Sequence, residues 1–110
     1  MVLLKTDKNN DIMKKEEWFY LLCLYEQGEL QEELVIPLFQ YLINSGHVWN
    51  LQGYHSSMAE MFIDEGYCVF GEESFTSAYG MNFPSRFDLI EGAMGTLSYQ
   101  SSRGYKYVEL

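Results

Sequence analysis

The sequence lacks Lys and Arg over its whole central stretch, from Glu16 to Ser85. Nucleic-acid binding needs Lys and Arg side chains against the phosphates, so this absence argues that the chain does not itself bind DNA or RNA. The stretch carries only acidic charge, from Glu16, Glu17, Glu26, Glu29, Glu32, Glu33, Glu60, Asp64, Glu65, Glu72 and Glu73. The basic residues are Lys5, Lys8, Lys14, Lys15, Arg86, Arg103 and Lys106, and the net charge is −9.

A surface of one sign has two interpretations. The first is electrostatic complementarity to a basic partner, which speeds encounter and selects the partner. The second is a solvated acidic surface that keeps the chain soluble. Under the first interpretation, the partner-contacting acids are expected to be Glu29, Glu32, Glu33, Glu60, Asp64, Glu65, Glu72 and Glu73.

Cysteine and histidine are scarce, with Cys23 and Cys68 in apolar stretches and His47 and His55 between them. The gaps between these four residues are 23, 7 and 12 residues, whereas structural zinc sites pair their ligands about two to five residues apart. We therefore expect no metal and no cofactor. We also expect no disulfide, because an intracellular compartment keeps thiols reduced.

A catalytic constellation is also missing. The carboxylate doublets are adjacent residues, whose side chains point about 100° apart on a helix and so do not form a dyad. The glycines are scattered and form no phosphate-binding loop. A thiol at Cys23, in an apolar helix face, is poorly placed to ionise. The sequence therefore predicts no catalytic residues and a protein that is not an enzyme.

Long apolar runs are absent too. No stretch approaches the roughly 20 apolar residues that span a bilayer, and the apolar run at the N-terminus is too short for a secretory signal. We expect a cytoplasmic protein without membrane contact. Residues 1–13 are polar and are expected to form a flexible leader ahead of one domain.

Aromatic residues, in contrast, are abundant: nine Tyr, seven Phe and two Trp. A chain of 110 residues has a thin core, so some of these rings are expected at an exposed patch or an interface. We take Tyr79, Tyr99 and Tyr105 as candidate partner-binding anchors.

Apolar spacing predicts a helical unit over residues 14–66, with helices at 14–28, 31–44 and 51–65. The middle helix has two adjacent apolar rows, and Pro37 requires it either to start near Glu33 or to kink. Asn50 is a plausible N-cap for the third helix. The expected shared core is Leu34, Leu38, Phe39, Leu42, Tyr54, Met58 and Phe62.

Residues 67–110 have mixed character. We expect a strand at 67–70, a loop at 71–84, a short helix at 85–94 opened by a Ser85–Asp88 capping pattern, and a hairpin of strands 96–100 and 105–109. The predicted fold class is α+β: a three-helix N-terminal unit, then a short strand, a short helix and a C-terminal β-hairpin.

The stretch from Leu42 to Cys68 resembles a family of small, uncharacterised phage proteins. The positions that carry the resemblance are Trp49, the Leu51-Gln52-Gly53 turn between helices, Ile63, Gly66 and Cys68. No activity comes with the resemblance. Small acidic phage proteins that are not enzymes are often inhibitors of host defence, including anti-CRISPR proteins. This association implies that the partner is a defence nuclease or a Cas effector.

The leading function hypothesis is therefore an acidic phage protein that binds and inhibits a host defence protein through its basic, nucleic-acid-binding surface. The alternative is a small homo-oligomeric structural or assembly protein, such as a homodimer, whose acidity serves only solubility.

Overall fold

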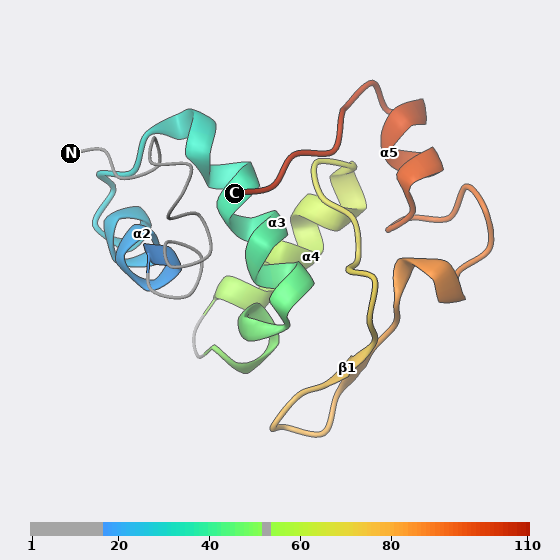
Figure 1. The fold of residues 1–110 in the computed structure, drawn as a ribbon, viewed down its shortest axis with the longest axis horizontal. Coiled ribbons are helices and arrows are strands. Elements are labelled where there is room, and N and C mark those ends of the chain that lie inside the picture. The colour runs from blue at the N-terminus through green and yellow to red at the C-terminus, as the bar shows by residue number, and fades with distance from the viewer. Residues whose placement is uncertain (1–16, 52–53) are drawn as a thin grey trace, which may run out of the picture.

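Helix α3 lies at the centre of the fold, and the other elements are arranged around it (Figure 1). A computed structural model describes residues 17–51 and 54–110. The elements are α2 (Trp18–Glu26), the 3-10 turn η4 (Glu32–Leu34), α3 (Val35–Ser45), η5 (His47–Asn50), α4 (His55–Glu65), β1 (Phe75–Thr76), β2 (Asn82–Phe83), η6 (Arg86–Asp88) and α5 (Leu97–Ser102). The fold is α+β as predicted, with helices first and a small antiparallel sheet later. No helix in the described ranges is long and apolar enough to cross a membrane, and the expected leader at 1–13 lies outside them.

The two apolar rows of α3 are buried as predicted, because spacings of three and four residues bring them onto one side of the helix. Leu38, Phe39 and Leu42 are completely covered, and Gly46 in a left-handed conformation ends the helix. The α-helix begins at Val35, after η4, so Pro37 falls in its first turn. N–H groups in the first turn of a helix have no acceptor within the helix, so the missing N–H of Pro37 costs no hydrogen bond. Because the helix begins so close to Pro37, it does not need to kink.

The core joins α2, α3 and α4 through aromatic rings that pack edge to face. The ring of Phe39 meets Tyr25 and Phe62 edge to face, with centroids 5.3 and 5.1 Å away. Of the predicted core residues, Leu38, Phe39, Leu42 and Phe62 are buried, and Leu34 and Met58 are half-buried. Tyr54 was predicted wrongly. It precedes the first turn of α4, is 49% exposed and stacks on His55.

The third helix begins at His55, later than predicted, and Asn50 does not cap it. Instead, the Asn50 Oδ1 accepts a hydrogen bond from the Ala78 N–H at 2.6 Å, in the turn between β1 and β2. This side chain therefore ties the hairpin to the helical unit.

The predicted strand at 67–70 is wrong, because buried side chains occupy the hydrogen-bonding groups that a strand neighbour would use. The Val69 N–H donates to Gln40 Oε1 at 2.9 Å, and Gln40 Nε2 donates to the Val69 carbonyl at 2.9 Å. The Tyr67 carbonyl likewise accepts from Gln100 Nε2 at 3.0 Å. Gln40 and Gln100 are both fully buried. Residues 67–70 thus run as an irregular segment pinned to α3 and α5.

The predicted C-terminal hairpin is also wrong. Residues 97–102 form α5, because the Thr96 hydroxyl accepts from the Tyr99 N–H and so caps a helix. Residues 105–110 form no strand, and they run back toward α3 (Figure 1). The Leu110 N–H donates to the Pro37 carbonyl at 3.3 Å, which fixes the end of this segment.

The two-stranded sheet lies inside the segment 71–84 that was predicted as a loop. Phe75 pairs with Phe83, and Thr76 pairs with Asn82. Trp49 stacks on Phe83 at 3.9 Å between centroids, and Phe75 covers Gly46 so closely that a side chain there would overlap the ring. Strands of two residues carry little signal in sequence, so the pairing depends on these tertiary contacts. Of the predicted helix 85–94 only η6 forms, with the predicted Ser85–Asp88 capping box.

Candidate binding surface

The acidic side chains lie on the outside of the molecule. Every Asp and Glu in the described ranges is exposed except Glu17, which is half-buried. The predicted contact residues fall into three groups: Glu29, Glu32 and Glu33 between α2 and α3; Glu60, Asp64 and Glu65 on α4; and Glu72 and Glu73 after the pinned segment. The α2–α3 junction and the C-terminal end of α4 lie well apart in Figure 1. The acids are therefore distributed in groups over the surface.

Two of the three Lys and Arg residues within the described ranges are paired with acids. Arg103 pairs with Glu65 at 3.3 Å, and Arg86 pairs with Glu72 at 3.6 Å. Of the eight predicted contact acids, only Glu65 and Glu72 have a cationic partner within the described ranges. The other six present negative charge to solvent: Glu29, Glu32, Glu33, Glu60, Asp64 and Glu73.

Arg86 stands out, since its charge is buried in an acidic protein. Its side chain is 8% exposed, and its guanidinium lies over the rings of Phe87 and Tyr107 at 5.5 and 5.3 Å. Its Nε–H has no hydrogen-bond acceptor among the described residues. Arg86 separates two surface hollows and contributes to the lining of both. Sequence reasoning missed this role, although an Arg directly after a long cation-free stretch is a visible signal.

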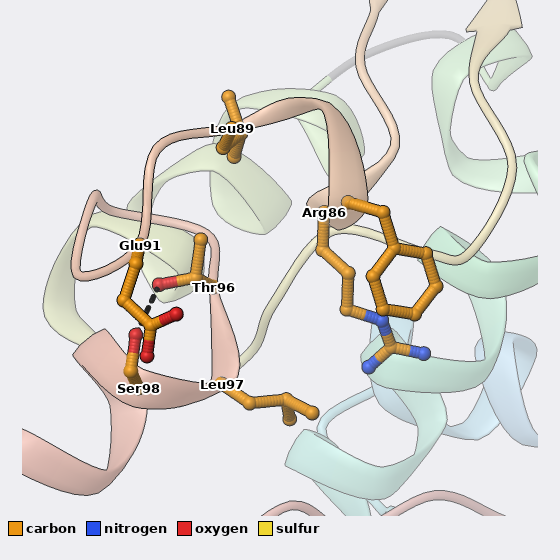
Figure 2. Close-up of a pocket in the computed structure, with 7 residues that line it drawn as sticks. Arg86, Leu89, Glu91, Thr96, Leu97 and Ser98 are labelled. Atoms are coloured by element: carbon orange, nitrogen blue, oxygen red, sulfur yellow. Dashed lines mark hydrogen bonds between the residues drawn. The ribbon is translucent and has the colours of Figure 1, made fainter.

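The first hollow holds about 270 Å³ and lies beside the loop 86–98. Its lining is Arg86, Phe87, Leu89, Glu91, Thr96, Leu97 and Ser98. Figure 2 shows Arg86 on one side, Glu91, Thr96 and Ser98 on the other, and the side chains of Leu89 and Leu97 at opposite ends. We call this the apolar hollow.

The second hollow, of about 290 Å³, lies on the other side of Arg86 and is polar. Three carboxylates line it, from Glu72, Glu73 and Glu109, together with Asn44, Arg86 and Tyr107. Asn44 Nδ2 donates to Tyr107 Oη at 2.7 Å, and this hydroxyl donates to Glu109 at 3.3 Å. Partial burial is the main reason that the pKa of Tyr107 is raised above its usual value. We call this the acidic hollow.

A third hollow, of about 250 Å³, lies between α4 and the loop 86–98. Ile63, Phe70 and Met94 form its apolar part, and Glu60 and Asp64 supply two carboxylates. Two predicted contact acids therefore meet here at an apolar depression.

The three candidate tyrosine anchors differ in availability. Tyr79, at the hairpin turn, is 63% exposed. Tyr99 is half-buried, and its hydroxyl donates to the Asp64 carbonyl at 2.8 Å, which ties α5 to α4. Tyr105 packs against Tyr67 with the two rings tilted and their centroids 4.6 Å apart, and a hydrogen bond between them raises the pKa of Tyr67. Only Tyr79 of the three has a side chain mostly in solvent.

The Cys and His residues lie in separate surroundings. Cys68 is buried with its Sγ 3.9 Å from the Ile36 carbonyl, and burial raises the pKa of its thiol to about 12. His47 stacks on Trp18 at 4.4 Å, and His55 lies 2.9 Å from Glu26. Across residues 17–51 and 54–110, no three His, Cys, Asp or Glu side chains are grouped so that they could hold a metal ion. The absence of enzymatic activity stays a prediction.

The family model described as a domain of unknown function, DUF7417, matches residues 20–82. This segment runs from α2 to β2 and ends before Arg86. No curated protein and no solved structure matches the chain. Of the residues that carry the phage-protein resemblance, Trp49, Ile63 and Cys68 are buried, and Gly66 ends α4 in a left-handed conformation. These residues build the fold, and Gln52 and Gly53 lie outside the described ranges.

Proposed function

The chain belongs to the DUF7417 family, a domain of unknown function. We therefore propose its function from its surface: it binds and inhibits a host protein by covering a basic, nucleic-acid-binding surface. The observation that supports this most is the solvent exposure of the acids, together with the internal use of Arg86 and Arg103. A surface of this kind attracts cationic surfaces and repels phosphates.

On the resemblance to phage proteins, we propose that the partner is a host defence protein, such as a nuclease or a Cas effector. The location would then be the host cytoplasm. Carboxylates placed where phosphates bind would compete with DNA or RNA for the same Lys and Arg side chains. Inhibition then needs no catalysis and no cofactor. It does need several charge contacts at once, because one exposed ion pair contributes only about 0–1 kcal/mol.

A homo-oligomeric assembly protein is the second candidate. It is favoured by large apolar side chains that are mostly in solvent, such as Phe87 at 68% and Ile90 at 83% exposed. The net charge of −9 opposes it, since two copies repel each other unless their acids are turned away from the contact.

The test is capture of host proteins on the immobilised chain, followed by elution with duplex DNA. We expect captured proteins to be released by DNA and by raising the salt from about 50 to 200 mM, because both act on phosphate-binding side chains. The variant Glu29→Gln, Glu32→Gln, Glu33→Gln should capture less. Its matched control is Ser57→Lys, Ser74→Lys, Ser101→Lys, which changes the net charge equally at other exposed positions. Captured proteins that neither DNA nor salt releases would contradict the proposal.

A further inference from the structure

Exposed apolar side chains gather in the loop 86–98. Phe87, Ile90, Met94 and Leu97 lie within eleven residues, and each is at least 45% exposed. Single exposed apolar residues are ordinary, whereas a contiguous group on one loop marks an interaction site. The loop also starts four residues after the segment that the family model matches.

The loop is held in one shape by its own hydrogen bonds. Ser85 and Asp88 form a reciprocal capping box around η6. The Thr96 hydroxyl donates to the Ala93 carbonyl at 2.7 Å, and the Ser98 hydroxyl accepts from the Gly92 N–H at 2.8 Å. The exposed apolar side chains are thus presented on a pre-organised backbone, which lowers the entropy cost of binding.

The apolar hollow is suited to one side chain. Its volume of about 270 Å³ lies below the ~300–1,000 Å³ of small-molecule sites. Phe87, Leu89 and Leu97 supply apolar surface, while the hydroxyls of Thr96 and Ser98 already have partners within the loop (Figure 2). An aliphatic side chain would bury apolar area there without leaving these groups unpaired.

Carboxylates lie at this hollow and near it. Glu91 belongs to its lining, and Asp88 is exposed on η6. Across Arg86, the acidic hollow adds Glu72, Glu73 and Glu109. Arg86 pairs with Glu72 and offsets that one charge, so Glu73, Glu91 and Glu109 remain as carboxylates without a cationic partner among the described residues. The charge next to the apolar hollow therefore complements Lys or Arg.

We infer that the loop 86–98 is a docking surface for a partner segment in which an apolar side chain is flanked by Lys or Arg. The apolar side chain enters the apolar hollow, and a neighbouring basic side chain meets the acidic hollow. The inference rests on the proposed function and names the anchoring site and the partner chemistry. A second copy of the chain fits worse, since its own Asp88 and Glu91 would face the same carboxylates.

The test uses the full ¹⁵N-labelled chain and three blocked peptides: Lys-Lys-Leu-Lys-Lys, Lys-Lys-Ser-Lys-Lys and Glu-Glu-Leu-Glu-Glu. We expect the first to shift the amide signals of Leu89, Leu97 and Ser98 and to bind at least about tenfold more tightly than the others, which is about 1.4 kcal/mol. Equal binding of the serine peptide would mean that the peptide is held by charge alone and that the apolar hollow does not contribute. Equal binding of the Glu-flanked peptide would remove the charge preference. Either result overturns the inference.

Variants separate this inference from the proposed function. Phe87→Ser and Leu97→Ser should weaken binding of the leucine peptide at least about tenfold and speed dissociation of a captured host partner. Met81→Ser removes a comparably exposed apolar side chain at the hairpin turn and should change neither. If partner binding stays salt-sensitive but ignores Phe87→Ser and Leu97→Ser, the proposed function stands and the docking surface is wrong. If the chain dimerises through Phe87 and Leu97, the occupant is a second copy and the inference also fails.

Discussion

Gln40 shows how one buried polar side chain determines the path of the backbone. Lying on the α3 face that packs against residues 67–70, it supplies both a donor and an acceptor to Val69. Its amide also donates to Asn44 Oδ1 at 3.0 Å. A buried glutamine amide that makes these bonds costs little, whereas an apolar replacement leaves the Val69 N–H and carbonyl without partners.

We therefore predict that Gln40→Leu lowers the free energy of unfolding by about 2–6 kcal/mol, at about 1–3 kcal/mol for each of the two Val69 backbone groups left unsatisfied. Urea denaturation measures this. Gln27→Leu, at an exposed position after α2, is the matched control and should change stability by less than about 0.5 kcal/mol. Equal stability of the two variants would mean that Gln40 does not pin residues 67–70.

Cys68 gives a second prediction at this scale. Burial raises the pKa of its thiol from 9.0 to about 12, because the thiolate is poorly solvated there. The thiol therefore contributes stability that is fully present below pH 9 and is lost as pH rises toward 12, since the unfolded chain ionises first. We expect iodoacetamide to modify the half-buried Cys23 long before Cys68 in the native protein. Mass spectrometry after brief labelling near neutral pH checks this, and equal labelling would contradict it.

At the scale of elements, α5 is the clearest departure from the sequence prediction. The alternation of residues 96–100 is compatible with a strand, but Thr96 at its start offers a hydroxyl N-cap, and the helix that follows turns Gln100 inward to Tyr67. The alternation favours a strand and the Thr96 cap favours a helix. The hydrogen bond from Gln100 to the Tyr67 carbonyl adds tertiary support for the helix.

Thr96→Val should therefore destabilise the protein by about 0.5–2 kcal/mol, the usual cost of a lost N-cap. Ser101→Ala, an exposed position in the same helix, is the control and should be nearly neutral. Thermal unfolding compares the two. A strand at residues 96–100 would respond the other way, because valine favours strands.

The accuracy of the sequence prediction follows from the range of the interactions involved. The α3 rows, the Ser85 capping box and the α+β class depend on spacings of three or four residues, so the sequence predicts them correctly. The hairpin depends on contacts with Trp49 and Asn50, and the path of residues 67–70 depends on Gln40. The residues in each of these contacts lie 28 to 34 positions apart in the sequence. The acidic contact residues were visible in the composition, but the acidic hollow arises only when α3, η6 and the C-terminal segment meet.

At the scale of the whole molecule, the acids and the apolar loop have different expected roles. Exposed charge acts over about 8 Å at physiological salt and so affects mainly the rate of encounter. The apolar loop acts only in contact and so affects mainly the rate of dissociation. Three separate acidic groups suit a partner whose basic surface is broad.

The association rate of a captured partner across a salt series tests the central claim most directly. For the native chain we predict a fall of at least about tenfold as salt rises, because electrostatic steering is screened. Glu29→Gln, Glu32→Gln, Glu33→Gln should start slower and depend less on salt than the charge-matched Ser57→Lys, Ser74→Lys, Ser101→Lys. An association rate that is the same for all three proteins and constant across the salt series would contradict the account. It would mean that the acidic residues serve only to keep the protein soluble.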